Sequence, residues 1–486
     1  MLPLIERLLK ALESEGVVYC HWKSNAFIAC AAHGEDDLDL LVGQGSRQAF
    51  WGILNRLGFK EALTSKGMLQ IPGILDYYGY DDTAGRLVHV HVHYKLILGH
   101  DMTKNYHLPI ENVYLESSFP GEFFRIPAPE FEWTIFVIRM MLKHSTWNAI
   151  LCGEGKLCSR ERQEMEYLQG KVSREQIGHV LAKHIPFLKL ELFDDCIRSL
   201  QPRCPLWFRF QVGYQVQKAL HACRLRPRAI DIWLQFWRRL IMAAKRRLFG
   251  FVPRMRMKNG GVLVAFVGGD GAGKTTVVEG IAKWLSPPFF MKQVHMGKPP
   301  WSFRTIFIRG ILKIGRILRL YPFSKAPVDF RDEVSPAVFP GYPTLIREVC
   351  TARDRYLSYA KARRHADKGA LVICDRFPLP QWIFMDGPQI EWMARSMPKK
   401  GFVALLDKLE RKYYQSIRLP DLLFVLKADP DMAVKRKSEE NTAFVRARSK
   451  EIWEKDWGGT AAHLIDANRP SREVLDKTKA VLWAHF

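Results

Sequence analysis

The chain has 486 residues, too many for one ordinary domain, so we expect two or three compact units, and a small disulfide-stapled module is excluded. Hydrophobic residues make up 48% and charged residues 25% of the sequence, which is the composition of a globular protein and excludes extended disorder. With 73 Lys and Arg against 50 Asp and Glu, the formal charge of +23 favours anionic partners, such as phosphorylated substrates, nucleic acid or an acidic membrane surface.

Residues 1–16 predict an amphipathic helix, because leucines recur at helical spacing among charged residues such as Glu6 and Lys10. Such residues do not suit a signal peptide, and no stretch of the sequence approaches the ~18 uncharged apolar residues of a membrane span. We therefore expect a cytoplasmic protein that meets a membrane, if at all, at its inner surface. The nine cysteines form no CxxC pair, which indicates free thiols; Cys152 and Cys158 are weak candidates for metal ligands.

Two carboxylates follow a small-residue turn in the segment YCHWKSNAFIACAAHGEDDLDLLVG. Asp37 and Asp39 are two positions apart on a predicted strand, so they face the same side and are spaced to share a divalent metal. A later predicted strand, LVHVHVHYKLIL, places His89, His91 and His93 on one face. This arrangement resembles the nucleotidyltransferase fold, in which a third acid on a later strand completes the metal site. In this sequence His91 stands at the position most similar to that acid.

The missing acid leaves two interpretations of residues 1–127, which we expect to form a nucleotidyltransferase-like α+β domain. In one, the domain has lost metal-dependent nucleotidyl transfer and binds a ligand. In the other, Asp37, Asp39 and His91 form a mixed site suited to Mn²⁺, Fe²⁺ or Zn²⁺ rather than Mg²⁺. The structural alternative is a half-buried strand on which histidines merely alternate with apolar residues.

Residues 128–247 predict mostly helices, and positive charge gathers toward their end. Twelve Lys and Arg residues stand between positions 218 and 258 against one acid, with aromatic residues interleaved. Residues 248–260, which include PRMRMKNGG, predict a basic linker. After the linker, apolar runs at VLVAFVG, ALVICD, LLFVLKA and HLID alternate with helical stretches, which predicts an α/β domain with a parallel, helix-covered sheet over residues 261–486.

The segment GGVLVAFVGGDGAGKTTVVEGIAKWL contains the pattern GxxxxGKT between a predicted strand and a predicted helix. Glycines let successive backbone N–H groups turn toward phosphates, and the helix N-terminus adds its positive dipole end. Lys274 is suited to neutralise phosphate charge, and Thr275 to ligate Mg²⁺. The pattern predicts a nucleotide-phosphate site made by Gly268, Asp270, Gly271, Ala272, Gly273, Lys274, Thr275 and Thr276.

The loop GGDGAGKTT resembles the phosphate loop of thymidylate kinases, and later segments follow in that family's order and spacing. TARDRYLSYAKARRHADKGALVICDRF is similar to the family's helix with a substrate-facing arginine and to the strand that ends in its Asp-Arg-aromatic motif, here Asp375, Arg376 and Phe377. LPDLLFVLKADPDMAVKRKSEENTAFVRARSKEIW resembles the family's Asp-Pro helix start and basic lid, and HLIDANRPSREVLDKTKAVL its closing strand and helix. Together these segments cover most of residues 261–486.

The resemblance implies a P-loop kinase that uses ATP and Mg²⁺, with Lys274, Asp375 and Arg376 as its catalytic residues. Asp375, at the end of a predicted parallel strand, would hold Mg²⁺ together with Thr275 or orient the attacking oxygen, and Arg376 would face phosphate. Arg355 matches the family's base-contacting arginine. The lid would neutralise charge on the transferred group through members of the set Lys435, Arg436, Lys437, Arg446 and Arg448.

The sequence departs from the thymidylate kinase pattern where the acceptor would bind. The family's Arg-Glu-Pro-Gly-Gly segment is missing, and VHMGKPPWSFRTIFIRGILKIGRILRLYPF stands in its place. Its cations, among them Arg309, Lys313 and Arg316, share one side of a helical wheel, which predicts a helix that lies on an anionic membrane or binds a polyanionic acceptor, unless it packs on its own domain. PLPQWIFMDGP after the Asp-Arg motif also differs, so we expect an acceptor other than thymidine monophosphate.

We therefore expect an ATP-dependent phosphotransferase whose acceptor is a nucleotide or a sugar or polysaccharide intermediate. The alternative is an ATP-gated binding module whose basic surface engages nucleic acid or membrane, with a degenerate nucleotidyltransferase domain. Nucleic acid is the less expected partner, because the sequence has no helix-turn-helix, zinc-finger or RNA-recognition signature. A homodimer is compatible with the sequence.

Overall fold

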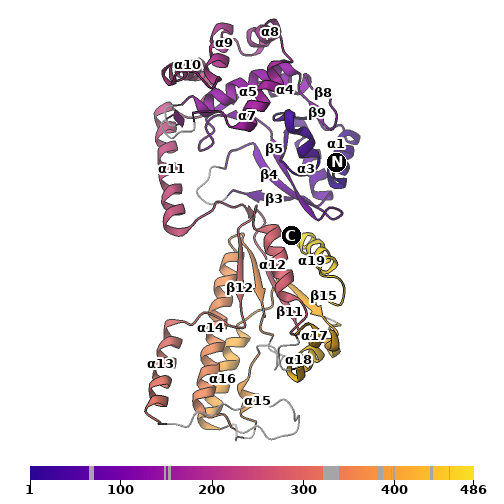
Figure 1. Cartoon of the computed structure of the whole chain (residues 1–486), viewed down its shortest axis with the longest axis vertical. Coiled ribbons are helices and arrows are strands. Elements are labelled where there is room, and N and C mark those ends of the chain that lie inside the picture. Colours follow the sequence, from indigo (N-terminus) through magenta and orange to yellow (C-terminus); the bar gives the residue numbers. More distant parts are fainter. Residues whose placement is uncertain are drawn as a thin grey trace. The chain divides into compact units, whose positions relative to one another are not determined.

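The computed structural model describes residues 1–64, 70–146, 149–150, 155–320, 339–379, 387–395, 397, 400–437, 442–458 and 460–486. The chain divides into two compact units, Met1–Met255 and Arg256–Phe486 (Figure 1). The division falls inside the stretch 248–260 for which the sequence predicts a linker. Within the described ranges, no helix is long and apolar enough to cross a membrane.

The N-terminal unit contains a sheet in which its strands follow the order β1-β2-β5-β4-β3. Strands β2 and β5 are parallel, and the pairs β1/β2, β3/β4 and β4/β5 are antiparallel. The register sets Asp39 of β2 and Asp76 of β4 on either side of His91 of β5, so three strands bring polar side chains together. The strands are β1 (Tyr19–His21), β2 (Leu38–Val42), β3 (Lys60–Leu63), β4 (Ile74–Asp81) and β5 (Arg86–His93).

Helices α1 (Pro3–Ser14) and α3 (Arg47–Arg56) pack against this sheet through apolar side chains. As its leucine spacing predicts, α1 is amphipathic and buries one side. The run LVHVHVHYKLIL, expected as one strand, is divided in the structure. Strand β5 ends at His93, and β6 (Leu96–Leu98) pairs with β7 (Tyr106–Leu108), because the β6 leucines belong to a second core.

That second core is built around α5 (Pro129–His144), which is buried on nearly all sides as a central helix is. Its buried side chains join Trp22, Leu41 and Leu96 with apolar residues of the following helices. The regions expected at 1–127 and 128–247 therefore share a core and lie in one compact unit. The other elements here are α2 (Ile28–Ala32), α4 (Glu111–Glu116), β8 (Phe119–Pro120), β9 (Arg125–Ile126), α7 (Ser159–Gln169), α8 (Arg174–His184), α9 (Leu190–Leu200), α10 (Leu206–Ala219) and α11 (Arg228–Phe249).

The C-terminal unit contains a five-stranded sheet in the order β12-β13-β11-β14-β15, in which all neighbouring strands are parallel. The expected parallel sheet of an α/β unit is thus confirmed. Strand β11 is buried along its whole length, as the central strand of a covered sheet requires. The strands are β11 (Leu263–Gly268), β12 (Met291–His295), β13 (Leu371–Asp375), β14 (Leu422–Lys427) and β15 (Ala462–Asp466); the short β10 (Arg256–Met257) precedes them.

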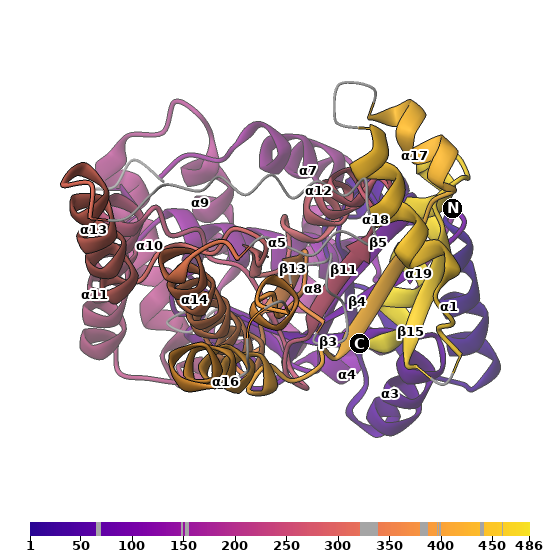
Figure 2. The same ribbon diagram turned by 90° about the horizontal axis from the view of Figure 1, so that it is seen from below.

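Helices cover both faces of this sheet. Figure 2 shows α12 (Lys274–Leu285) on one side of β11 and β13, and α14 (Tyr342–Ala366) with α16 (Gly401–Gln415) on the other. Helix α12 contacts α19 (Ser471–His485), and α14 contacts α16. The remaining helices are α13 (Phe303–Ile317), α15 (Ile390–Met393), α17 (Pro430–Arg436) and α18 (Thr442–Glu454).

Helix α13 is amphipathic as predicted, but its apolar side is exposed. Phe303 is 91% exposed and Phe307 69%. Arg309, in contrast, lies 4.4 Å from the centre of the Trp301 ring, and its Nη2 donates to Thr351 Oγ1 at 3.3 Å. Helix α13 contacts α14, so it packs on its own unit as that alternative expects, and Lys313 and Arg316 are exposed. The packing differs from a simple apolar contact, because Arg309 also faces the unit while Phe303 and Phe307 do not.

Candidate functional site

A glycine-rich turn connects β11 to α12 in the C-terminal unit. Gly268 ends the strand and Lys274 begins the helix. Gly271 and Gly273 have φ angles of +83° and +79°, in the left-handed region that favours glycine. A Cβ on Gly271 would lie 2.6 Å from the Ala433 carbonyl oxygen, whereas a Cβ on Gly273 would meet nothing within 4 Å. Gly271 is therefore required both for its backbone angle and for the close approach of α17.

Lys274 folds back over this turn. Its Nζ donates to the carbonyl oxygens of Gly268 and Gly269, both at 2.8 Å, and the residue is only 8% exposed. Burial lowers the pKa of Lys274 to about 8, although the nearby Asp270 acts in the opposite direction. An ammonium group held within this glycine-rich turn, at the N-terminus of a helix, is placed to meet an entering anion.

Asp270 of the turn is joined to arginines from two other elements. Its Oδ1 lies 3.3 Å from Arg376 Nη2, and its Oδ2 lies 3.0 Å from Arg448 Nη1. Burial alone would raise the pKa of Asp270, but the hydrogen bond from Arg448 and the charge of Lys274 lower it on balance. The turn thus collects three cations and one carboxylate, a cluster of net positive charge that suits phosphate.

Asp375 and Arg376 lie at the carboxyl end of β13, beside β11. The register pairs Asp375 with Phe266 of β11 and with His295 of β12. Asp375 Oδ1 is buried without a hydrogen-bond partner in the described part of the chain, and Oδ2 lies 4.0 Å from His295 Nε2. A buried carboxylate oxygen with unused lone pairs fits a bound cation. Arg376 has a φ of +54°, an uncommon angle outside glycine that clusters at functional sites.

The predicted lid residues differ in where they lie. Arg448 of α18 reaches Asp270, and Arg436 of α17 donates from Nη1 to the carbonyl oxygens of Ala467 at 2.9 Å and Gly271 at 3.4 Å. Arg446 instead pairs with an acid of α17, at 2.5 Å from Asp431 Oδ1, and its side chain is 53% exposed. The structure therefore brings Arg436 and Arg448 to the glycine-rich turn, and it does not bring Arg446 there.

Arg355 of α14, the predicted base-contacting residue, is 5% exposed and engaged by the chain itself. Its Nε donates to the Met296 carbonyl oxygen at 3.1 Å and its Nη2 to that of Gly297 at 3.2 Å, while Nη1 donates to Tyr414 Oη at 2.5 Å. These bonds fix the segment that follows β12. A direct contact between Arg355 and substrate stays a prediction.

A cavity of about 220 Å³ opens beside the turn. Gly273 and Thr276 line it from the turn and the first part of α12, and Arg436, Ala467 and Ser471 line it from α17 and the segment after β15. Ala467 and Ser471 lie in the segment that resembles the closing strand and helix of thymidylate kinases, but that resemblance assigned them no role; the parallel pairing of β14 with β15 brings them here. Sequence reasoning did not identify them.

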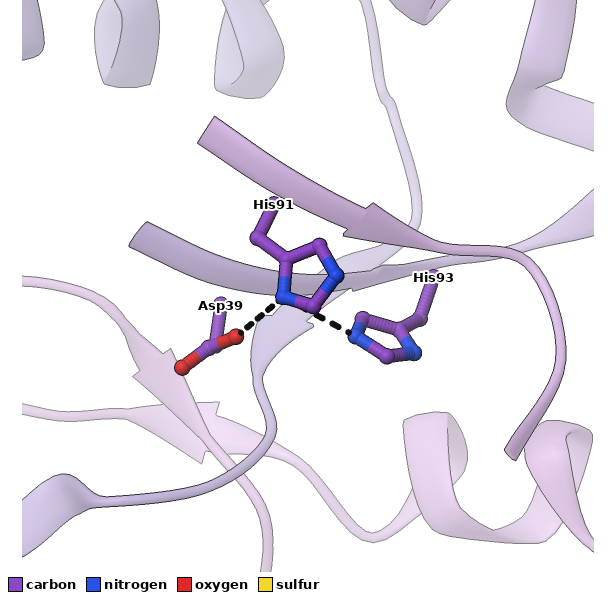
Figure 3. Close-up of side chains that lie close together, drawn as sticks. All are labelled: Asp39, His91 and His93. Carbon is purple, nitrogen blue, oxygen red and sulfur yellow. Dashed lines mark hydrogen bonds and ion pairs between the residues drawn. The ribbon is translucent and has the colours of Figure 1, made fainter. Parts of the chain in front are cut away.

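A second polar cluster lies in the N-terminal unit, where Asp39, His91 and His93 point toward one another (Figure 3). Asp39 Oδ1 lies 3.0 Å from His91 Nδ1, which lies 3.4 Å from His93 Nε2. Lys23 Nζ also lies 2.9 Å from Asp39 Oδ1. Burial alone would raise the pKa of Asp39, but Lys23 and His91 hold it well below its usual range.

This cluster differs from the predicted grouping of Asp37, Asp39 and His91. Asp37 precedes β2 and contacts His89 Nδ1 at 2.6 Å, while His89 Nε2 contacts Asp76 Oδ1 at 3.0 Å. His93 takes the place expected for Asp37, and its alternation with His91 was the signal that could have included it. Of the two cysteines considered as metal ligands, Cys158 is exposed without a disulfide, and Cys152 lies outside the described residues.

No family model matches the chain. The chain is 26% identical over 227 residues to a protein of Escherichia coli strain K12 named uncharacterized ATP-binding protein YghS, a match that covers 46% of this chain and 92% of the relative. The uncharacterized ATP-binding protein YghR of the same strain is 26% identical over 221 residues, with coverages of 45% and 85%. A probable thymidylate kinase of Staphylothermus marinus is 25% identical over 240 residues, with coverages of 47% and 98%.

Among solved structures, that of deoxyadenosine kinase from M. mycoides with bound dATP matches at 14% identity and covers 45% of this chain and 98% of that one, with a TM-score of 0.27, too low to establish a common fold. None of these names bears on the nucleotidyltransferase resemblance, which stays a prediction. The resemblance to thymidylate kinases is confirmed as a distant similarity. Over nearly half its length, the chain is similar to ATP-binding proteins and to a probable thymidylate kinase.

Proposed function

We propose that the C-terminal unit is an ATP-dependent phosphotransferase. The observation that carries this proposal is the cluster at the glycine-rich turn, in which Lys274 and two arginines surround the start of α12. Backbone N–H groups, a buried ammonium group and guanidinium groups are together the donors that phosphate oxygens need. The relatives named ATP-binding proteins and a probable thymidylate kinase support the same activity.

Each residue of the cluster has a proposed task. Lys274 would exchange its bonds to the Gly268 and Gly269 carbonyl oxygens for bonds to phosphate, and Arg448 would neutralise charge on the transferred group. Thr275, exposed at the start of α12, and Asp375 would hold Mg²⁺, which when bound reduces repulsion between phosphate oxygens.

The cavity of about 220 Å³ beside the turn would take the nucleotide base. It adjoins Gly273 at the turn itself, and the planar guanidinium of Arg436 lines it, a group that stacks readily on flat rings. Because Thr276 and Ser471 add hydroxyl groups, the cavity also contains donors and acceptors for the polar edge of a base.

We propose an anionic acceptor, either a nucleotide or a phosphorylated sugar intermediate. A groove of about 410 Å³ in the same unit is lined by Arg309, Lys313, Arg316 and Arg347, and Trp301 borders it. Guanidinium groups bind phosphate through paired hydrogen bonds, and an indole ring packs on the flat face of a sugar or a base. Helix α13, which carries most of these cations, occupies the place of the missing thymidylate kinase segment, so thymidine monophosphate is not the acceptor we propose.

ATP turnover with Mg²⁺ across a panel of nucleoside monophosphates and free or phosphorylated sugars tests this proposal. We expect one acceptor class to raise turnover at least severalfold and to carry the transferred phosphate. Lys313→Ala should raise the KM for that acceptor, whereas Arg304→Ala, on the same helix but away from the groove, should leave it unchanged. Tight ATP binding without stimulation by any acceptor would contradict a phosphotransferase and favour the ATP-gated binding module.

We also propose that α11 docks on an anionic membrane surface. The helix buries polar residues and exposes aromatic ones: Asp231 and Gln235 are 7% and 3% exposed, whereas Trp233 and Phe236 are 59% and 60% exposed. Polar contacts hold the buried side within the unit, since Gln235 Nε2 donates to Asp231 Oδ2 at 2.8 Å and to Thr103 Oγ1 at 3.3 Å. Cations interleaved with these aromatic residues match the charge of anionic headgroups, the combination found in helices that lie at membrane interfaces.

Sedimentation with phosphatidylglycerol-containing vesicles tests this docking. We expect binding that weakens in high salt and falls at least tenfold in Phe236→Ser, because an exposed aromatic side chain no longer enters the interface. Trp51→Ser is the matched control, since Trp51 is 54% exposed on α3. Equal binding to neutral phosphatidylcholine vesicles, or a dimer in light scattering that Phe236→Ser dissociates, would contradict the membrane and, in the second case, indicate another copy of the chain.

A further inference from the structure

We propose that Asp39, His91 and His93 bind one divalent transition metal ion. The three side chains come from the parallel pair β2 and β5 and converge on one point (Figure 3), with one ligand atom from each lying within 4.8 Å of the others. The site belongs to the N-terminal unit and is independent of the proposed phosphotransferase.

The contacts within the cluster cannot all be hydrogen bonds. His91 Nδ1 lies 3.0 Å from Asp39 Oδ1 and 3.4 Å from His93 Nε2, and an imidazole nitrogen directs a single hydrogen or a single lone pair in the plane of its ring. If that hydrogen points to Asp39, it does not serve His93; if His93 donates to His91, the Asp39 contact becomes a lone-pair repulsion. A cation shared by all three atoms removes this conflict.

The separations also match a coordination sphere. Bonds of about 2.1 Å to nitrogen and oxygen place neighbouring ligand atoms about 3.0 Å apart around an octahedral ion and about 3.4 Å apart around a tetrahedral one. The observed values are 3.0 and 3.4 Å. Two of the three pairs of side chains therefore already lie at ligand spacing, and the ligand atoms of all three lie within 4.8 Å of one another.

His93 adds an independent observation. The residue is 3% exposed, its Nε2 contacts His91, and its Nδ1 is buried without a hydrogen-bond partner in the described ranges. A metal ion bound at Nε2 would give this buried ring one strong partner, while Nδ1 lies on the other side of the ring. His89, two residues before His91 on the same face, differs because both of its ring nitrogens contact carboxylates.

The ligand set indicates the class of metal. Two imidazole nitrogens and one carboxylate oxygen suit Mn²⁺, Fe²⁺, Co²⁺ or Zn²⁺, whereas Mg²⁺ prefers oxygen ligands. Three protein ligands leave coordination positions open, and His91 and His93 line a cavity of about 130 Å³ that Lys23, Lys104 and Arg139 also line. Asp76 also lines the cavity, but the three cations outnumber it, so we expect an anionic ligand with phosphate or carboxylate as its metal-binding group.

Titration of the full chain with Co²⁺, followed by visible absorption, tests the proposal. We expect one saturable site without the thiolate charge-transfer band that cysteine ligands produce. Asp39→Asn and His91→Gln should each weaken binding at least ~100-fold, since even residues that only orient metal ligands contribute 10- to 100-fold. Lys23→Gln should tighten binding, because Lys23 competes with the metal for Asp39 Oδ1.

His89→Gln is the matched control and should keep the site, and Lys274→Ala should bind Co²⁺ like the wild type whether or not the phosphotransferase proposal holds. Inorganic phosphate added to the cobalt-loaded protein should shift the absorption band if the open positions face the cations. Thermal unfolding of each variant without metal separates loss of a ligand from loss of the fold. Absence of a saturable site, or equal binding by Asp39→Asn and His91→Gln, would overturn the proposal.

Discussion

Replacing Lys274 by alanine is expected to lower acceptor-dependent ATP turnover by a factor of about 10² to 10³, the loss typical of one preorganised donor to developing charge. The buried ammonium group donates to the backbone carbonyl oxygens of Gly268, the last residue of β11, and of Gly269 in the turn. Turnover and ATP affinity, measured together by a coupled assay and calorimetry, check this. Lys283→Ala is the control: Lys283 is an exposed residue in the last turn of the same helix, and its removal should change neither turnover nor ATP affinity.

The same lysine makes ATP binding dependent on pH. Because burial lowers the pKa of Lys274 to about 8, the ammonium form is lost from the free turn as the pH rises through that value. Phosphate favours the charged form, so wild-type binding should weaken above this range and take up about half a proton near pH 8. Calorimetry in two buffers with different ionisation enthalpies measures this uptake. An alanine variant with the same proton uptake would contradict the assignment.

Asp375→Asn is expected to lower kcat by a factor of about 10² or more, because it removes the charge that would hold Mg²⁺ and orient the acceptor while keeping the shape of the side chain. Half-maximal activity should also require more Mg²⁺. Since Asp375 Oδ1 is buried without a partner in the described residues, the neutral amide should leave the melting temperature unchanged or raise it. This separates a catalytic loss from unfolding.

His295→Gln is the control for Asp375. His295 pairs with Asp375 in the register of β12 and β13, but its side chain is 47% exposed and its Nε2 lies 4.0 Å from the carboxylate. An exposed contact of this length contributes little, so kcat should change by less than about threefold. An Asp375→Asn variant with wild-type kcat and Mg²⁺ dependence would remove Asp375 from the proposed machinery.

The sequence pattern identified four strands of the C-terminal sheet and missed β12. The apolar runs that became β11, β13 and β14 are largely buried strands, which is why composition identifies them, whereas the run at β15 has one buried residue, Ile465. Strand β12 was missed because none of its positions is buried and Lys292 and Gln293 interrupt its apolar residues. The cavity residues Ala467 and Ser471 were missed because pairing between strands, rather than any local pattern, brings them to the turn.

In the N-terminal unit, sequence identified the residues of the polar cluster but not their partners. Asp76 escaped notice because its contact with His89 depends on the antiparallel pairing of β4 with β5, which no local pattern reveals. Periodicity likewise predicts that α13 has two sides, yet it does not say which side meets the rest of the unit. Phe303, an apolar residue at the start of the helix, is 91% exposed.

The two ion pairs of Asp270 have a consequence for the release of product. Asp270 pairs with both Arg376 and Arg448, so each guanidinium group has a carboxylate partner in this partly buried site. An entering phosphate would compete with this carboxylate for both arginines, and a leaving phosphate would return them to it. Under the proposed function, Asp270 would therefore compete with the ligand for both arginines, which would moderate affinity, order the arginines in advance and favour dissociation.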